Sequence, residues 1–216
     1  MSASIQVSSR ASEHSPSRPT ALIATDVFGH TPAIDSLARQ LAVDATIISP
    51  FADPARPFRS EQEAYEAFIA GGGIARYTEK IAHVLEQAAI PFQLALGFSA
   101  GASALWLSVA ESPENNVNPN ISCIRNAVLF YGSRIREYRM LRPTCPVRLI
   151  FAEQEAAFEP AGLVQDLRQR GHAAEIHSDS KHGFMNAYSR GYCVQSYTRY
   201  LGELSAMLHP SMYHTA

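Results

Sequence analysis

Short, continuously apolar segments alternate with amphipathic segments along most of this chain, and this alternation constrains its fold more than any other feature. Six apolar runs have the length and composition of buried strands, over residues 21–25, 45–50, 91–98, 126–132, 145–153 and 173–177. Helical spacing of apolar residues occurs over about 30–42, 61–70, 74–88, directly after Ser99, over 160–171 and over about 191–208. Ser60 and Glu63 form the capping-box pattern that begins the helix at 61–70. Strands separated by helices are typical of a parallel sheet covered on both faces, so we predict a three-layer α/β fold with about six mostly parallel strands.

The length and composition of the chain indicate one folded domain. The 216 residues are enough for a single sizeable core, and 46% of them are hydrophobic. Residues 1–19 are rich in Ser and poor in large apolar side chains, so burial cannot offset the entropy lost on ordering them. We therefore expect a disordered tail over 1–19 and an α/β domain over 20–210.

Charge and cysteine content exclude several classes of function. The formal net charge of −2 gives no indication of a nucleic-acid partner. No apolar run approaches the roughly 18 residues that a membrane span needs. Cys123, Cys145 and Cys193 are widely spaced, and no pair has the spacing of metal ligands. We expect reduced thiols in a cytoplasmic protein, with no metal, no nucleic-acid partner and no membrane partner; the oligomeric state is left open.

The segment Gly97-Phe98-Ser99-Ala100-Gly101 fits the pattern G-x-S-x-G and lies between a predicted strand and a helix of small residues. The pattern alone is weak, but this position is where a nucleophile elbow occurs. Such an elbow presents the Ser99 hydroxyl at the carboxyl edge of the sheet, and it needs small residues at Gly97 and Gly101 because strand and helix nearly touch there. We predict that Ser99 is a nucleophile rather than part of an ordinary tight turn.

A serine hydroxyl needs a base to take its proton, and His182 is the best candidate among eight histidines. It lies in the loop that follows the sixth predicted strand, where a base can reach the same sheet edge. His30, which follows the first strand, is the alternative. The remaining histidines are expected near the chain ends, within helices or strands, or at helix ends.

A carboxylate that orients the imidazole is expected after the strand that precedes the histidine strand. The sequence AEQEAAFEP supplies Glu153, Glu155 and Glu159 there. Glu155 is favoured because it lies just past the strand. Glu153 stays an alternative, and Glu159 is better explained as a residue of the first helical turn. The order serine, acid, histidine is the one found in α/β-hydrolases.

An oxyanion formed on the substrate would need two backbone donors. The amide of Ala100, directly after Ser99, is one candidate. The other is expected in the loop TDVFGH after the first strand, where Phe28 is our candidate. Asp26 in the same loop lies at the edge of the expected site, either as a site residue or as a loop-capping aspartate.

With these residues in view, the chain resembles the dienelactone hydrolase family of α/β-hydrolases. Four pieces carry the resemblance: DVFG after the first strand, GFSAG, AEQEAAFEP and HGF, spread from about residue 21 to 205. The resemblance implies a cofactor-free cytoplasmic enzyme that cleaves a small-molecule ester or lactone. It supports Glu155 as the acid, and it matches Asp26 to an acidic residue that the family places beside the nucleophile.

The chain also departs from the family pattern. The founding enzymes use cysteine where this chain has Ser99, and the acid is usually aspartate rather than glutamate. They carry an arginine that binds the substrate carboxylate, and this chain has Asn186 near that place. The antiparallel strands that usually begin the fold are not expected here.

The expected reaction is ester hydrolysis through an acyl-enzyme on Ser99. A thioesterase or acyltransferase would use the same three residues, and a catalytically idle scaffold that binds a partner is a third reading. Phe51, Phe58, Trp106 and Tyr131 are candidates either for an acyl pocket or for the core. The arginine cluster Arg134, Arg136, Arg139 and Arg142 is either a solvated basic face or a contact for an anionic substrate.

Overall fold

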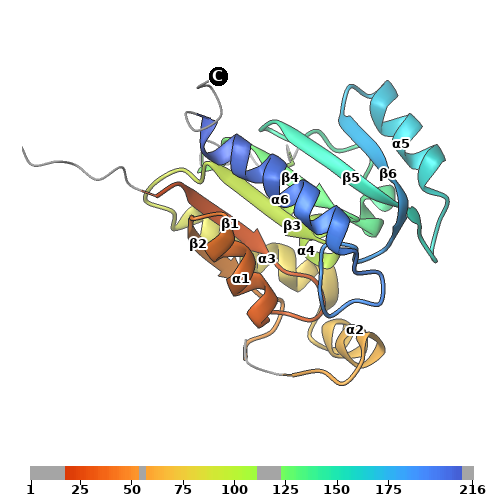
Figure 1. Cartoon of the computed structure of the whole chain (residues 1–216), viewed down its shortest axis with the longest axis horizontal. Helices are drawn as coiled ribbons and strands as arrows, with labels where there is room; N and C mark the ends of the chain where they lie inside the picture. The colour runs from red at the N-terminus through yellow and green to blue at the C-terminus, as the bar shows by residue number, and fades with distance from the viewer. Residues whose placement is uncertain (1–17, 54–56, 111–122, 211–216) are drawn as a thin grey trace, which may run out of the picture.

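The computed structural model describes residues 18–53, 57–110 and 123–210. Within these ranges the chain forms one six-stranded sheet with helices on both of its faces (Figure 1). The strands are β1 (Thr20–Ala24), β2 (Asp44–Ile48), β3 (Leu94–Phe98), β4 (Ala127–Phe130), β5 (Val147–Gln154) and β6 (Ala173–Lys181). The helices are α1 (Pro32–Gln40), α2 (Glu61–Ala70), α3 (Gly73–Glu86), α4 (Ala100–Ser108), the short 3₁₀ helix η2 (Ser133–Glu137), α5 (Pro160–Gln169) and α6 (Val194–Leu208).

The strands lie in the order β2-β1-β3-β4-β5-β6, and every pair of neighbouring strands is parallel. This confirms the predicted three-layer α/β architecture with a mostly parallel sheet, and within the described ranges the sheet contains no antiparallel strand. The chain moves outward from β1 to β2 and then returns to place β3 on the other side of β1. The loops after β1 and β3 therefore meet at a topological switch point, where open α/β sheets bind their ligands.

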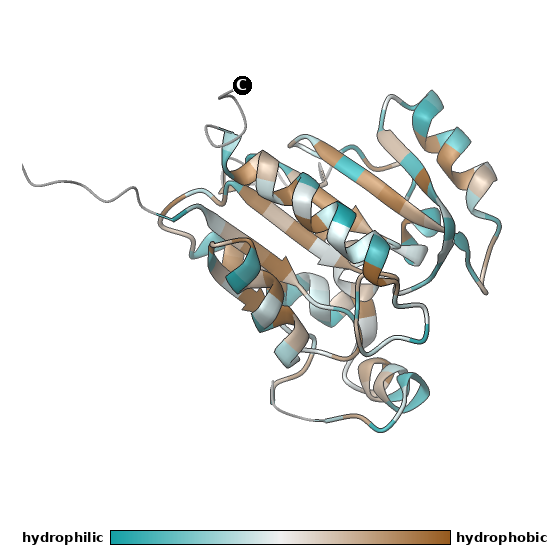
Figure 2. Ribbon diagram, in the orientation of Figure 1, coloured by the Kyte–Doolittle hydropathy of each residue, from teal (hydrophilic) through white to brown (hydrophobic). Residues whose placement is uncertain are grey.

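Two apolar layers hold the helices on the sheet. Helices α1 and α6 cover one face, where Ile34 and Tyr200 pack with strand residues such as Ile23. Helices α3, α4 and α5 cover the other face, where Ile81 and Trp106 pack with their own set of strand residues. Figure 2 shows the matching pattern, with the central strands mainly hydrophobic and hydrophilic residues on the outward sides of the helices. Each large side chain buried in this way contributes about 1.5–3 kcal/mol.

The Ser60 capping signal is confirmed, whereas several predicted boundaries are wrong. The hydroxyl of Ser60 accepts the amide of Glu63 at 3.1 Å, as the capping pattern requires. Strand β2 was expected to be buried, but it lies at the sheet edge and only Ile48 in it is buried. Helix α6 begins at Val194 rather than near 191, and β6 continues to Lys181 rather than ending at 177. The predicted tail lies mainly at residues 1–17, outside the described ranges.

None of the helices in the described ranges combines the length and apolar character needed to cross a lipid bilayer. Cys123, Cys145 and Cys193 are all free thiols.

Candidate active site

Ser99 lies at a sharp turn between β3 and α4. Its backbone has φ 49° and ψ −109°, a conformation that residues other than glycine rarely adopt. A Cβ atom on Gly97 would lie 2.6 Å from the Cα atom of Ala102, and one on Gly101 would lie 2.5 Å from the carbonyl oxygen of Thr25. The two glycines are therefore required by close backbone approach, and the strand-turn-helix geometry has the form of a nucleophile elbow.

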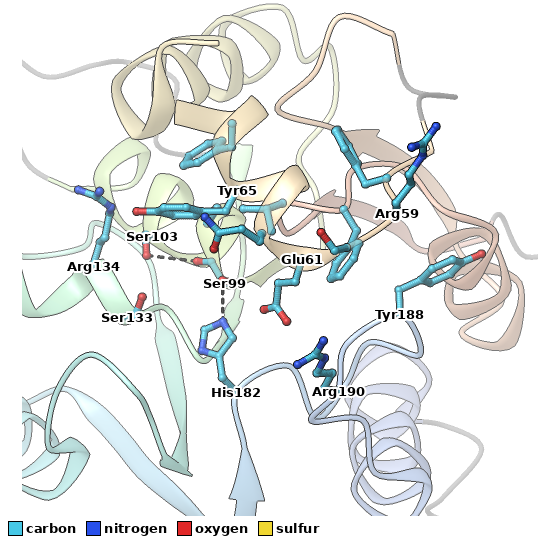
Figure 3. Close-up of a pocket in the computed structure, with 17 residues that line it drawn as sticks. Arg59, Glu61, Tyr65, Ser99, Ser103, Ser133, Arg134, His182, Tyr188 and Arg190 are labelled. Atoms are coloured by element: carbon cyan, nitrogen blue, oxygen red, sulfur yellow. Dashed lines mark hydrogen bonds between the residues drawn. The ribbon is translucent and has the colours of Figure 1, made fainter. Parts of the chain in front are cut away.

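The structure brings three predicted side chains together at the carboxyl edge of the sheet. The Ser99 Oγ atom lies 2.8 Å from Nε2 of His182, and Nδ1 of His182 lies 2.8 Å from Oε2 of Glu155. Figure 3 shows the hydrogen bond between Ser99 and His182, among the residues that line a cavity. The side chain of Glu155 is only 3% exposed, so water does not compete strongly for its contact with the imidazole. The three groups form a continuous chain of hydrogen bonds from hydroxyl to imidazole to carboxylate.

The environment of His182 favours the charged imidazole. Burial alone lowers the pKa of His182, but the hydrogen bond and the charge of Glu155 outweigh it, with smaller help from Glu61 and Asp26. The net effect raises the pKa above its ordinary value of 6.5. The ring of Tyr131 packs against the imidazole at 5.0 Å between ring centroids. A histidine held in this way can accept a proton from Ser99 and retain it.

The alternatives considered for the base and the acid lie elsewhere. Glu153 is exposed, and its Oε2 atom accepts the amide of Asp179 at 2.8 Å. Glu159 caps the beginning of α5 by accepting the amide of Ala161. The imidazole of His30 is bound to Asp35 at 2.6 Å. The hydrogen-bond chain at Ser99 is built instead with His182 and Glu155.

The loop after β1 corrects one prediction. The amide of Phe28, expected to face an oxyanion, donates instead to Oδ1 of Asp26 at 3.0 Å. The amide of Val27, one residue earlier, donates to no acceptor within the described residues, and Val27 and Ala100 both line the cavity beside Ser99. Because the Asp26 side chain accepts the Phe28 amide, the donor left in this loop is the Val27 amide, one residue earlier. No sequence signal marks this displacement.

Asp26 itself is buried, with 6% of its surface exposed. Burial raises its pKa to about 6, against the opposing hydrogen bonds from Asn186 and from the amide of Phe28. The charge of His182 also favours the ionised carboxylate. Asp26 is thus both the residue that shapes the loop and an ionisable group close to the imidazole.

A cavity of about 670 Å³ opens beside Ser99. Its aromatic lining comes from Phe28, Phe58, Tyr65, Phe68 and Tyr188. Of the four aromatic residues considered from the sequence, Phe58 lines this cavity, Phe51 packs against Phe58, and Trp106 and Tyr131 are fully buried in the core. Helix α2 contributes Tyr65 and Phe68 together with Glu61 and Gln62, so the cavity presents both aromatic and polar groups to a substrate.

Charged side chains surround the mouth of the cavity. Arg59, Glu61, Arg134 and Arg190 all contribute to its lining, and Figure 3 shows Glu61 and Arg190 beside His182. The arginine cluster noted in the sequence is divided by the fold. Arg134 lines the cavity, whereas Arg139 pairs with Asp166 at 3.1 Å and Arg136 lies over the ring of Phe158. The sequence did not single out Glu61 or Val27, because nothing in their local context marks a site.

Within residues 18–53, 57–110 and 123–210, no group of three or more His, Cys, Asp or Glu side chains could hold a metal ion.

Comparisons with known proteins extend the description of the fold. No family model matches the chain. The uncharacterized protein YczH of Bacillus subtilis is 29% identical over 177 residues, which cover 78% of this chain and 82% of that protein.

Solved structures share the architecture at low sequence identity. A Klebsiella pneumoniae protein assigned to the dienelactone hydrolases has a TM-score of 0.65 and 19% identity, covering 91% of this chain and 90% of that one. A protein assigned to the hydrolases from Agrobacterium vitis has a TM-score of 0.58 and 15% identity, covering 88% of each chain. The dienelactone hydrolase-like promiscuous phosphotriesterase P91 from metagenomic libraries has a TM-score of 0.54 and 13% identity, covering 88% of this chain and 87% of that one. The chain therefore has the fold of the dienelactone hydrolase-like α/β-hydrolases.

Proposed function

We propose that this protein is a serine hydrolase that cleaves a carboxylic ester or lactone through an acyl-enzyme on Ser99. The observation that carries the proposal is the unbroken hydrogen-bond chain from Ser99 through His182 to the buried Glu155. Ser99 and His182 both line the cavity that would hold a substrate. Fold likeness to hydrolases supports it but does not assign an activity.

Acylation begins at the serine. His182 Nε2 takes the proton of the Ser99 hydroxyl as Oγ forms a bond to the substrate carbonyl carbon, and the carbonyl oxygen becomes an oxyanion. Glu155 stabilises the imidazolium that results. Collapse of the tetrahedral intermediate breaks the bond to the leaving oxygen, which takes the proton from His182 and departs as an alcohol. A lactone would follow the same course with its ring opened.

Deacylation repeats these steps with water. His182 removes a proton from water as its oxygen attacks the acyl carbon, and the proton then passes to Ser99 Oγ as the acid departs. For the oxyanion in both halves, we propose the amides of Ala100 and Val27 as donors. Both residues line the cavity, and α4 begins at Ala100, so the positive end of its dipole faces the same point.

Covalent labelling combined with hydrolysis tests the proposal. A fluorophosphonate should label the wild-type protein on Ser99, Ser99→Ala should abolish labelling, and His182→Ala should reduce the hydrolysis of a nitrophenyl ester by about 10⁴-fold. A wild-type protein that is folded, unlabelled and inactive would favour an idle binding scaffold. A panel of nitrophenyl esters, lactones and acyl thioesters, with and without an alcohol acceptor, separates an esterase from a thioesterase or acyltransferase. The cytoplasmic location stays a prediction.

A further inference from the structure

Asn186 joins the loop that carries His182 to the loop after β1. It is buried, with 6% of its surface exposed, and lies four residues after His182. Its Nδ2 atom donates to Oδ2 of Asp26 at 2.5 Å, and its Oδ1 atom accepts the amide of Tyr188 at 2.9 Å. A backbone amide only donates, so the contact with Tyr188 fixes which end of the side-chain amide faces Asp26. A single side chain thus connects two segments that are 160 residues apart in sequence.

On the β1 side, the contact reaches the carboxylate that shapes the turn. Oδ1 of Asp26 accepts the amide of Phe28, and its backbone carbonyl accepts the amide of Gly29 at 3.0 Å. Gly29 ends this turn with φ +76°, in the left-handed region that favours glycine. These bonds fix the Asp26–Gly29 turn, and the direction of the Val27 amide is set by that turn. Asn186 holds the other oxygen of the same carboxylate.

On the other side, the backbone of Asn186 organises the histidine loop. Its amide donates to the carbonyl of Gly183 at 2.9 Å, and its carbonyl accepts the amide of Ser189 at 2.9 Å. The loop is tied to β5 by the bond from the His182 amide to the carbonyl of Gln154 at 3.2 Å. The ring of Tyr188, labelled in Figure 3, lies against Phe28 with 6.2 Å between centroids. Both loops that border Ser99 therefore meet at Asn186.

We propose that Asn186 is a positioning residue for ester cleavage. Its bond to Asp26 holds the loop that carries His182 and the Val27 amide in a fixed position relative to each other. This inference rests on the proposed function. Asn186 touches neither Ser99 nor the reacting atoms, and its effect passes through Asp26 and the loop backbone. Loss of the bond displaces base and oxyanion donor relative to one another, and a displacement of about 1 Å is enough to lower turnover about 100-fold.

Asn186→Asp removes the donor to Asp26 while it keeps the acceptor for Tyr188 and nearly the same shape. It places a second carboxylate against Asp26, whose environment also includes His182, Glu61, Tyr77 and Tyr131. At the alkaline end of a series from about pH 6 to about pH 10, the two carboxylates repel. As the pH falls, the pair binds one shared proton and regains a hydrogen bond.

We therefore expect Asn186→Asp to lower kcat by about 10- to 100-fold near pH 10 with a change in KM below about 3-fold. The ratio of its kcat to that of the wild type should rise steadily as the pH falls. Asn186→Ala should lower kcat, relative to the wild type, by a factor that does not depend on pH. Asn126→Asp, an exposed substitution that adds the same charge, should leave the ratio near one.

Exchange of the two side chains supplies the second test. In the double variant Asp26→Asn with Asn186→Asp, the amide introduced at position 26 can accept the Phe28 amide and donate to the new carboxylate. We expect this exchange to restore most of the kcat that Asn186→Asp loses near pH 10, which independent contributions of the two residues would not predict.

Two results would overturn the inference: wild-type kcat in Asn186→Asp at every pH, or an exchange variant no more active than Asn186→Asp. The labelling rate of Ser99 by a fluorophosphonate separates this failure from that of the proposed function. If the wild type is labelled and active while the Asn186 variants match it, only the positioning role fails. If the wild type is not labelled, the proposed function itself fails. Recovery of Asn186→Asp at lower pH also shows that the variant is folded.

Discussion

Gly101→Ala tests the contact that forces the Ser99 turn. The added Cβ atom would lie 2.5 Å from the carbonyl carbon of Ala24 and from the carbonyl oxygen of Thr25, and closer still to the oxygen of Ala24. Ordinary contacts of a Cβ atom begin near 3.4 Å, so α4 and the end of β1 must separate by about 1 Å. Neither partner is a flexible side chain, so the strain cannot be relieved by a rotamer change.

The separation should affect both stability and rate. Overpacking of this kind costs about 3 kcal/mol, which corresponds to a fall in Tm of about 6–12 °C for a domain of this size. The same movement shifts Ser99 and the loop at Thr25–Val27 apart, and we expect kcat for a nitrophenyl ester to fall about 100-fold.

Gly202→Ala is the matched control for this substitution. Gly202 is exposed in α6, and no atom lies within 4 Å of an added Cβ there. The alanine should raise stability by about 0.5–1 kcal/mol and leave kcat unchanged. Calorimetry and ester hydrolysis on both variants provide the comparison. A Gly101→Ala protein with the Tm and kcat of the wild type would refute the close approach described for the turn.

Other predictions concern the charges around the site and the far edge of the sheet. The acidic limb of the kcat/KM profile should lie above pH 6.5, because His182 must be neutral to act as a base and its pKa is raised. Glu155→Gln should move that limb to lower pH, because burial then dominates the pKa of His182. The same variant should lower kcat by at least about 100-fold. An acidic limb that stays in place would contradict the contact between Glu155 and His182. Arg148 donates to Glu175 and to Glu203 at 2.7 Å, so Arg148→Met should lower Tm by about 3–8 °C while kcat is retained, as measured by thermal unfolding and ester hydrolysis. An unchanged Tm would show that this network contributes nothing to stability.

The sequence predicted the layers of the fold because burial on both faces produces continuous apolar runs. It did not predict the polar extension of the last strand from 178 to 181, since the hydrophobic pattern ends where side chains reach solvent. Beyond a register shift near Ala152, Gln154 still pairs with Lys181. This polar extension places the loops of Glu155 and His182 next to each other, so the segment that sequence analysis missed is the one that brings acid and base together.

The side chains at the candidate site were predicted more completely than its backbone. Ser99, His182 and Glu155 could be chosen from residue type and position after a strand, and the structure places them in contact. Phe28 was chosen by the same reasoning, but a backbone donor depends on which amide a neighbouring carboxylate occupies. The bond between Asp26 and Asn186 could not be foreseen either, because it depends on how two distant loops pack.

Mass spectrometry of an acyl-enzyme tests the central claim most directly. The protein is mixed with an ester whose acyl group leaves slowly, quenched in acid during turnover and digested. The account predicts a mass increase equal to the acyl group, minus the displaced hydrogen, on the peptide that contains Ser99. Steady turnover with no adduct in the burst phase, or an adduct on a different side chain, would contradict it.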